Sequence, residues 1–446
     1  MEIELCAVSG YTQVTRNMSA IRVDDEVIII DMGMDIGMMA LHETEEGNGK
    51  LLSTEQLISI GAVPDDKKIE DWKSKVKAIV LGHCHLDHIA AVRYLASKYK
   101  CPIIGTPYTI EVLKATLRDD EIRLPNRFIK IDPDSKMKLS ENIILEFVTV
   151  THSTLQCSIV VLHTEIGDIV YGNDFKFDAN PVLGKTTNFL RLKEIGNSGK
   201  VIALIVESMY AHRPGHTPDE LKAKDMLIDT IVNEADKEKA IFVTMFSSHI
   251  ARIKSAIEAG EKIKRKVMVL GRSMAKYIRA GENAGLIKFS KSIEIGEYGS
   301  QRKRLLKELN ESREKFLVVC TGGQGEPGSI LDKIVNKQLP FIFKEGDLVI
   351  FSCSVIPQPI NRANRERLEK ILDVNRVKIY RDIHSSGHAS AEDLRDIIKL
   401  LKPKHLIPSQ GESFQLDALV KISEEEGYKL NKNVHLLKDG ERLILN

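Results

Sequence analysis

Short runs of β-branched and other apolar residues recur along this chain, each followed by glycine or a polar cluster. Fully buried strands have this appearance. We expect strands at 27–30, 78–81, 143–150, 159–162, 169–171, 201–206, 316–319, 348–351 and 377–379. Helical periodicity appears between them at 90–98, 218–233, 250–259, 302–310, 362–372 and 391–401. This alternation predicts an α/β fold.

The composition is that of a globular protein. The 446 residues include 64 Lys and Arg against 63 Asp and Glu, and 43% are hydrophobic. These values exclude a disordered chain, a collagen and a coiled coil. At ~100–200 residues per domain the length allows more than one domain. Because no Pro/Gly-rich linker is visible, we expect a second domain to be inserted in the first.

The sequence also bears on the compartment. No basic N-terminal region is followed by an apolar stretch, and no run approaches the ~20 apolar residues that span a bilayer. The 6 cysteines are scattered without a CxxC pair, which favours reduced thiols. We therefore expect a cytoplasmic protein with neither a membrane segment nor disulfides.

Three histidines and an aspartate stand together after the run 78–81. Residues 82–88 read Gly-His-Cys-His-Leu-Asp-His, and imidazole with carboxylate is the ligand set of Zn²⁺ or Mn²⁺. His152 and Asp174 follow two later strands. A lone His or Asp after a strand is usually a cap or turn residue, but here each repeats the arrangement of the first cluster.

These side chains could surround two metal ions. His83, His85 and His152 would bind one ion, Asp87 and His88 the other, and the Asp174 carboxylate would bridge them. Two neighbouring ions generate a nucleophile at neutral pH and neutralise charge in a displacement, which is hydrolase chemistry.

Two neighbours of the cluster are not expected to be ligands. Asp31, which closes the run 27–30, is better placed to hold the histidine loop. Cys84 stands between two expected ligands, so its side chain should turn into the protein.

With these motifs in place, the chain resembles the metallo-β-lactamase hydrolases and, within them, the β-CASP nucleases of the archaeal ribonuclease J type. Asp31, residues 83–88, His152 and Asp174 match the four lactamase motifs in order. Glu207 matches the acidic β-CASP motif, and His-Ser-Ser-Gly-His at 384–388 matches the later histidine motif.

The resemblance implies an αββα metallo-β-lactamase sandwich with an inserted β-CASP α/β domain. The first part of the sandwich would cover 1–207, the β-CASP domain 208–360, and the returning part of the sandwich 361–446. It also implies zinc-dependent hydrolysis of RNA, single-stranded RNA as the partner, and a homodimer.

Three residues are expected to take part in catalysis. A histidine held by a carboxylate suits a general acid, because the negative partner favours the protonated imidazole. His388 with Glu207 is therefore the expected acid pair, although Glu207 could instead be a solvated acid. Asp87 is expected to act both as a ligand and in catalysis.

Other residues suit RNA phosphates. Enzymes like ribonuclease J remove nucleotides from a 5′ end, which requires a grip on the terminal phosphate, and hydroxyls with a guanidinium suit that task. Backbone N–H groups beside small residues can approach a phosphate, and His384 either contacts the scissile phosphate or makes a structural hydrogen bond. The expected phosphate-binding residues are Ser247, Ser248, Arg272, Ser273, His384, Ser386 and Gly387.

A basic stretch surrounds part of this set. Residues 251–280 contain nine Lys and Arg and only two acids. Such a run is usually a solvated helix face. Beside a phosphate pocket it is better interpreted as a strip that follows an RNA backbone, with salt-sensitive binding.

One motif departs from the family pattern. The family has Pro-x-His-Gly-Glu where this chain has Pro-Ser-Gln-Gly-Glu at 408–412. The amide oxygen of Gln410 is a weaker zinc ligand than imidazole and better suited to harder ions. The second zinc should therefore be loosely held, exchange readily with Mn²⁺, or be absent.

Two functions follow. The first is a metal-dependent ribonuclease that degrades RNA from 5′ to 3′ and prefers single-stranded RNA with a 5′-monophosphate. Whether it also cleaves as an endonuclease stays open. The second, suggested by Gln410, is a catalytically weakened paralogue that binds RNA or serves in a nuclease complex.

Overall fold

The chain folds into two compact units. The computed structural model describes residues 1–39, 52–236, 238–356 and 358–445. Unit 1 comprises Met1–Asp178, Lys185–Thr217 and Gly387–Asn446, and unit 2 comprises Ala179–Gly184 and Pro218–Ser386. The chain therefore enters unit 2 briefly at Ala179–Gly184, returns to unit 1, enters unit 2 again after Thr217 and returns to unit 1 after Ser386. The domain boundaries expected from the sequence, after residues 207 and 360, remain a prediction.

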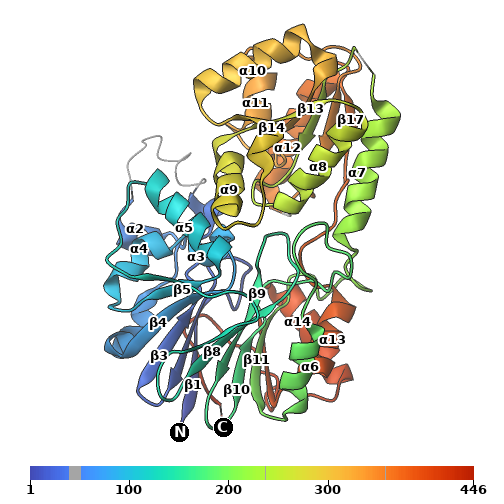
Figure 1. Cartoon of the computed structure of the whole chain (residues 1–446). Helices are drawn as coiled ribbons and strands as arrows, with labels where there is room; N and C mark the ends of the chain where they lie inside the picture. Colours follow the sequence, from blue (N-terminus) through green and yellow to red (C-terminus); the bar gives the residue numbers. More distant parts are fainter. Residues whose placement is uncertain (40–51, 237, 357, 446) are drawn as a thin grey trace. The chain divides into compact units, whose positions relative to one another are not determined.

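Unit 1 contains two sheets, drawn in the lower part of Figure 1. The first has the order β19-β1-β2-β3-β4-β5-β6, and its strands β3 to β6 run parallel. Its strands are β1 Ile3–Ser9, β2 Met18–Val23, β3 Glu26–Ile30, β4 Val76–Leu81, β5 Ile103–Gly105, β6 Phe128–Lys130 and β19 Arg442–Leu445.

The second sheet of unit 1 has the order β18-β11-β10-β9-β8-β7. Strands β10, β11 and β18 are parallel, and β7 to β10 are antiparallel. Its strands are β7 Lys136–Lys138, β8 Ile144–Thr149, β9 Ser158–His163, β10 Asp168–Tyr171, β11 Val201–Glu207 and β18 His405–Ser409.

The core of unit 1 lies between its two sheets. Leu5, Ile28 and Val80 of the first sheet belong to the same apolar cluster as Phe147 and Ile205 of the second. Because successive residues of a strand point to opposite faces, each central strand can bury one face here and the other under helices.

Helices flank the two sheets on their outer faces (Figure 1). A second apolar cluster packs α6, α13 and α14 against the second sheet, and α5 packs on β5 and β6 of the first. The sandwich is thus αββα. The helices are α2 Thr54–Ser59, α3 Leu86–Ile89, α4 Val92–Leu95, α5 Pro107–Asp119, α6 Phe189–Asn197, α13 Ala391–Leu401 and α14 Ser413–Glu425, with 3₁₀ turns η1 Asp66–Lys75 and η2 Ala96–Lys98.

Unit 2 is built on a single parallel sheet of order β14-β13-β15-β12-β16-β17. The strands are β12 Ile241–Thr244, β13 Lys266–Leu270, β14 Ile293–Gly296, β15 Phe316–Cys320, β16 Leu348–Phe351 and β17 Lys378–Tyr380. The helices are α7 Glu220–Glu234, α8 Ile250–Lys262, α9 Arg272–Asn283, α10 Gly299–Glu311, α11 Ile330–Val335 and α12 Pro359–Val374, with 3₁₀ turns η3 Phe289–Lys291 and η4 Arg313–Lys315. The predicted α/β class is confirmed.

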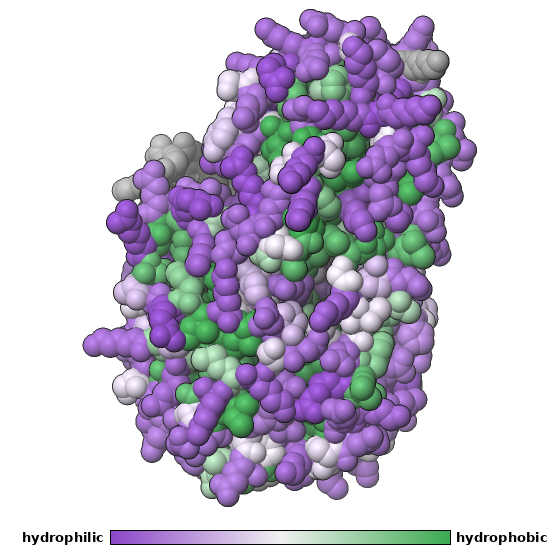
Figure 2. Space-filling view, in the orientation of Figure 1, coloured by the Kyte–Doolittle hydropathy of each residue, from purple (hydrophilic) through white to green (hydrophobic). Residues whose placement is uncertain are grey.

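The surface in Figure 2 is largely hydrophilic, and its hydrophobic side chains gather in separate patches. Within the described ranges, none of the helices combines the length and the apolar character needed to cross a membrane.

A buried ion pair ties together several segments of unit 2. Arg252 of α8 is fully buried, and its guanidinium donates two hydrogen bonds to the Glu220 carboxylate, at 2.6 and 2.8 Å. The same guanidinium donates to the carbonyl and hydroxyl of Ser352, at 3.0 and 2.9 Å. Burial alone would raise the pKa of Glu220, but His249 and Arg252 hold it well below its usual value. The pair is therefore ionised inside the unit.

Replacement of Arg252 by Met should destabilise unit 2. The change leaves the Glu220 carboxylate buried without its partner, which typically costs about 3–5 kcal/mol. Urea unfolding followed by circular dichroism measures the loss. Arg304 is the matched control, because its contact with Glu308 lies at the surface and such pairs contribute at most about 1 kcal/mol. Equal effects of Arg252→Met and Arg304→Met would contradict the assignment.

Candidate metal centre

The candidate ligands of unit 1 lie at or beyond the ends of its central strands. Residues 83–88 follow β4, His152 follows β8, and Asp174 follows β10. Glu207 is the last residue of β11. In parallel strands the carboxyl ends meet at one edge of a sheet, which is where α/β folds assemble their sites. His88 lies in the one-turn helix α3, which begins after His85.

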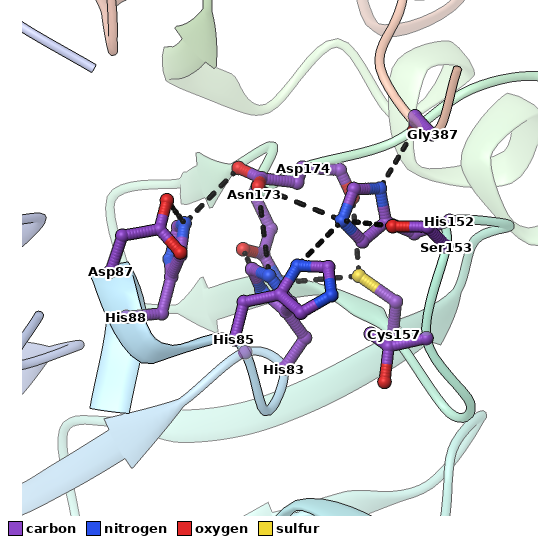
Figure 3. Close-up of polar contacts among 12 residues, drawn as sticks. His83, His85, Asp87, His88, His152, Ser153, Cys157, Asn173, Asp174 and Gly387 are labelled. Atoms are coloured by element: carbon purple, nitrogen blue, oxygen red, sulfur yellow. Dashed lines mark hydrogen bonds and ion pairs between the residues drawn. The ribbon is translucent and has the colours of Figure 1, made fainter. Parts of the chain in front are cut away.

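The structure brings these side chains together as two groups that share one carboxylate. The ligand atoms of His83, His85, His152 and Asp174 lie within 4.8 Å of one another, as do those of Asp87, His88 and Asp174. Figure 3 shows the Asp174 carboxylate between the Asp87–His88 pair and His152. Each group offers at least three nitrogen or oxygen donors, the kind of set that holds a divalent ion.

His83 is oriented by an asparagine. Its Nδ1 lies 2.9 Å from Asn173 Oδ1, so Nδ1–H donates and Nε2 keeps its lone pair for the cluster. The Asn173 amide is fixed in turn, because Nδ2 donates to the Ser158 carbonyl at 3.0 Å. Glycine is required at position 82, since a Cβ there would lie 2.3 Å from Asn173 Nδ2.

His88 is held from two sides. Its Nδ1 donates to the Asp31 carboxylate at 2.7 Å, and both side chains are fully buried. Asn17 Nδ2 lies 3.1 Å from His88 Nε2 and can donate to it only when that nitrogen carries no proton. Such a carboxylate–histidine contact sets the ring orientation of a metal ligand. Asp31 therefore lies where a residue that holds the histidine loop is expected.

His152 is positioned by the chain segment that also carries His388. The Gly387 carbonyl accepts a hydrogen bond from His152 Nδ1 at 2.7 Å (Figure 3). A Cβ at Gly387 would lie 2.9 Å from the same nitrogen and 2.8 Å from Ser153 Oγ. Only glycine allows this close approach. Because position 387 has no side chain, its carbonyl can reach His152 and orient the ring.

Several buried acceptors of the cluster make no hydrogen bond with any described residue, although His88 Nε2 lies 3.2 Å from Asp174 Oδ1 as an ion pair. Among the described residues, the two carboxylate oxygens of Asp174 and the Nε2 of His83 are buried without a hydrogen-bond partner. Unpaired buried acceptors cost free energy, and a divalent cation would remove that cost. The donor set and these acceptors therefore both fit a metal centre.

The pKa values of the imidazoles agree with this interpretation. Burial, reinforced by neighbouring imidazoles, lowers the pKa of His83 and of His152 well below the usual value, so both are neutral and can offer lone pairs. For His88, burial is outweighed by Asp174, Asp87 and Asp31, which raise its pKa well above the usual value. Metal binding would displace that proton.

Gln410 lies at the edge of this network. It follows β18, its backbone N–H donates to the Gly10 carbonyl at 2.7 Å, and its Nε2 donates to the Tyr171 hydroxyl at 3.3 Å. Its Oε1 is buried and has no hydrogen-bond partner among the described residues. An amide oxygen left in this state suits a weak, hard-ion ligand.

Buried Glu207 pairs with His388, whose side chain is 17% exposed, beside the cluster. His388 Nδ1 lies 2.7 Å from Glu207 Oε2, and Glu207 Oε1 accepts from the backbone N–H of Phe175 at 2.9 Å. His388 also lies within the third potential ligand group, with Asp174 and Glu207. Burial alone would lower the pKa of His388, but the Glu207 charge and hydrogen bond raise it to about 10. The imidazole is therefore protonated at neutral pH in the metal-free chain.

The expected phosphate-binding residues divide between the units. In unit 2, Ser247 and Ser273 lie 2.8 Å apart through their hydroxyls. Exposed Arg272 begins helix α9, whose N-terminal amides favour an anion. Ser248, His384 and Ser386 also belong to unit 2, whereas Gly387 belongs to unit 1.

The predicted basic strip is wrong in two of its members. Arg252 is buried in the ion pair with Glu220, and Arg265 is buried with its guanidinium donating to the carbonyls of Lys239 and Asp236. Arg279 pairs with Glu297. Sequence counts cannot separate a buried arginine from a surface one. The exposed remainder is Lys262, Lys264, Lys266, Arg272 and Arg279.

Sequence reasoning missed the two asparagines, Asn17 and Asn173. Asn173 has a φ of 57°, and asparagine is one of the few residues common in this left-handed region. Its place between Gly172 and Asp174 was the available signal.

The Cys84 side chain turns into the protein, as expected. Its Sγ lies 2.9 Å from Thr154 Oγ1, and burial raises the pKa of its thiol to about 12.

Family models match most of the chain. The metallo-beta-lactamase superfamily model matches residues 11–232, and the ribonuclease J beta-CASP domain model matches residues 238–374. A model described as the Zn-dependent metallo-hydrolase RNA specificity domain matches residues 376–437. Together with the αββα sandwich and the inserted α/β unit, these matches define a metallo-β-lactamase protein of the β-CASP class.

Similar proteins narrow the class. Ribonuclease J of Methanocaldococcus jannaschii is 42% identical over 99% of both chains, and that of Pyrococcus abyssi is 40% identical over 98% of this chain and 96% of its own. The chain belongs to the ribonuclease J family. A crystal structure of a protein of unknown function from Enterococcus faecalis V583 shares the fold, with a TM-score of 0.68 at 19% identity over the whole of both chains.

Replacement of Asn173 by Ala should weaken metal binding without removing a ligand. The change frees the ring of His83, and loss of such an orienting partner typically costs about 10–100-fold in metal affinity. Competition titration with a chromogenic chelator measures the effect. Asn142→Ala is the matched control, because this exposed asparagine contacts Glu26 away from the cluster. Unchanged affinity in Asn173→Ala would show that His83 needs no such support.

The pKa of His388 should depend on Glu207. In the metal-free protein the imidazole should keep its proton to about pH 10, far above its usual value of about 6.5. The pKa of His388 is higher in the folded protein than in the unfolded chain. The protonated imidazole therefore stabilises the fold fully at low pH, and this stabilisation is lost as the pH rises toward 10. In the Glu207→Gln variant the pKa of His388 should fall by about two units or more, because the negative partner is gone. NMR titration of the histidine ring signals reads both values, and an unshifted His388 in the variant would refute the pairing.

Proposed function

We propose that the chain is a metal-dependent ribonuclease that hydrolyses RNA phosphodiesters. The observation that supports this most directly is the pair of donor groups that share Asp174, with the Glu207–His388 pair beside them. The ribonuclease J relatives support RNA as the substrate.

Zinc is the ion we propose, with Mn²⁺ as a substitute. Imidazole and carboxylate donors suit both ions. His83, His85, His152 and Asp174 would hold one ion; Asp87, His88, Asp174 and, weakly, Gln410 would hold the second. When bound, two such ions would neutralise charge on the phosphodiester and allow water to be deprotonated at neutral pH.

His388 is proposed as the general acid. Departure of the 3′ oxygen produces a strongly basic alkoxide, so a proton donor lowers the barrier. The Glu207 carboxylate keeps His388 protonated at neutral pH, and the hydrogen bond from Phe175 N–H keeps Glu207 in place. Asp87, whose side chain is partly exposed, is proposed to combine metal binding with a role in catalysis.

We propose that the chain degrades RNA in the 5′-to-3′ direction and prefers single-stranded RNA that carries a 5′-monophosphate. Ser247, Ser248, Arg272 and Ser273 supply hydroxyls, a guanidinium and the start of helix α9 for that phosphate. His384, Ser386 and Gly387 are proposed to contact the scissile phosphate. Endonuclease cleavage by the same residues is compatible with this arrangement. We also propose a homodimer that works in the cytoplasm.

Gln410 supports a second candidate function. If its amide oxygen holds the second ion too weakly, the chain would bind RNA or a nuclease partner without cutting. Digestion of end-labelled RNA with Zn²⁺ or Mn²⁺ separates the two functions. Release of mononucleotides from the 5′ end supports the first, and retained RNA binding without cleavage under either metal supports the second.

Charge reversal in Arg272→Glu should impair substrates with a 5′-monophosphate more than those with a 5′-hydroxyl. A charge-assisted contact contributes about 1.5–3 kcal/mol, so we expect a loss of roughly 10–100-fold on the phosphorylated RNA alone. Initial rates on two RNAs that differ only in the 5′ group measure it. Arg304→Glu, an exposed reversal on α10 of the same unit, is the control. Equal losses on both RNAs would remove Arg272 from the 5′ pocket.

A further inference from the structure

Three aromatic side chains form a row that leads away from His388 in unit 1. The ring of Tyr210 lies 5.8 Å from that of His388, the ring of His212 lies 6.2 Å from Tyr210, and Phe414 lies 5.1 Å from His212. We call Tyr210, His212 and Phe414 the aromatic row. The ring pairs are edge-to-face, with interplanar angles of 88° for Tyr210 and His388, 76° for Tyr210 and His212, and 62° for His212 and Phe414, so each contact covers a face of only one ring.

The backbone fixes this row relative to His388. Gln415, the neighbour of Phe414, donates from Nε2 to the Met209 carbonyl at 2.6 Å. Tyr210 also forms an isolated β-bridge with Ser390, two residues beyond His388. The segments that carry the row are therefore tied to each other and to the candidate acid.

The aromatic row is not part of the hydrophobic core of unit 1. Phe414 is 53% exposed although it is a large apolar side chain, and His212 is exposed. None of the three residues belongs to the apolar clusters that pack the described sheets and helices of this unit. Exposed rings that do not fill a core and lie beside a catalytic pair indicate a binding surface.

A positive charge accompanies the row. The guanidinium carbon of Arg213 lies 3.6 Å from the centre of the Tyr210 ring, and the side chain is exposed. Its backbone N–H donates to the Tyr210 carbonyl at 2.9 Å, and its own carbonyl accepts from Ala391 at 2.9 Å. Arginine stacked in this way keeps its N–H groups for an anion.

We propose that His212 and Phe414 of the aromatic row stack unpaired nucleobases of the RNA next to the scissile phosphate, with Arg213, held on the Tyr210 ring, on the intervening backbone. The inference rests on the proposed ribonuclease function and adds a base-binding subsite to it. Proteins that bind single strands without sequence preference combine aromatic stacking platforms with a cationic contact to the backbone. Because every base has a stacking face, the subsite would grip any sequence but would require bases.

The direct test compares two RNAs of equal length, one normal and one in which every nucleotide is an abasic ribose. Binding is measured by fluorescence anisotropy in EDTA, so that hydrolysis does not intervene. Stacking on aromatic side chains typically changes affinity by about tenfold per base. The wild-type protein should prefer the normal RNA by at least that factor, and Phe414→Ala and His212→Ala should lose much of the preference. Phe414→Tyr should keep it.

Phe189→Ala is the matched control. Phe189, the first residue of helix α6, is 42% exposed in unit 1, and its ring lies 4.8 Å from that of Phe177. This variant should keep the wild-type preference, and Phe414→Leu preserves an apolar side chain without a stacking face if Phe414→Ala folds poorly. An equal preference in the wild-type protein and the Phe414 variants would overturn the proposal. So would loss of self-association in these variants with the RNA preference intact, because the row would then be a protein contact.

The same protein preparations separate this subsite from the proposed function. Cleavage of the normal RNA is assayed in parallel with Zn²⁺ or Mn²⁺. A base preference that depends on Phe414, without any cleavage, would uphold the aromatic row and overturn the ribonuclease function. Cleavage together with a preference that ignores Phe414 would do the reverse.

Discussion

The arrangement of unit 1 depends on one buried carboxylate. Asp174 belongs to all three groups of potential ligands, and neither of its oxygens has a hydrogen-bond partner among the described residues. A buried carboxylate is costly without a compensating positive charge. In the metal-free protein His88 supplies that charge, with Nε2 3.2 Å from Asp174 Oδ1, and bound metal ions would supply it in the loaded protein. Asp174 follows β10, a central strand of the second sheet, so the sandwich holds this charge where the histidine loop of the first sheet meets it.

The surrounding residues act mainly by orienting the donors. Asn173 and Asp31 each orient the ring of one histidine, and the Gly387 carbonyl orients that of a third. Glycines 82 and 387 permit these contacts because a Cβ at either position would collide with the partner. Metal chemistry therefore depends on neutral amides and backbone as much as on the ligands. The Glu207–His388 pair follows the same principle, because the carboxylate orients the imidazole.

Much of the fold could be predicted from apolar periodicity. All nine expected strands overlap observed ones, and helix α13 has the expected bounds, but ten of the 19 strands in the described part of the chain were not predicted. Strand β18 was missed because it contains Pro408, which argues against a central strand, and it lies at the edge of its sheet. Strand β13 was missed because it lies in the basic stretch, and the helix expected at 90–98 is only α4 followed by a 3₁₀ turn.

The candidate site could be predicted where ligand chemistry is concentrated in sequence. The histidine loop, His152 and Asp174 stood out because each follows a strand. The partners of Arg252, the asparagines that orient histidines, and the aromatic row could not be found, because they depend on contacts between residues far apart in the chain. The carbonyl of Gly387, for example, reaches His152 across 235 positions.

Metal content measures the central claim most directly. The wild-type protein, saturated with zinc, dialysed and analysed by elemental analysis, should hold at least one ion per chain, because the group that includes Gln410 is expected to hold its ion only loosely. Asp174→Asn should lose most of this metal, because both donor groups lose the carboxylate that they share. A variant that keeps the wild-type metal content would contradict the account.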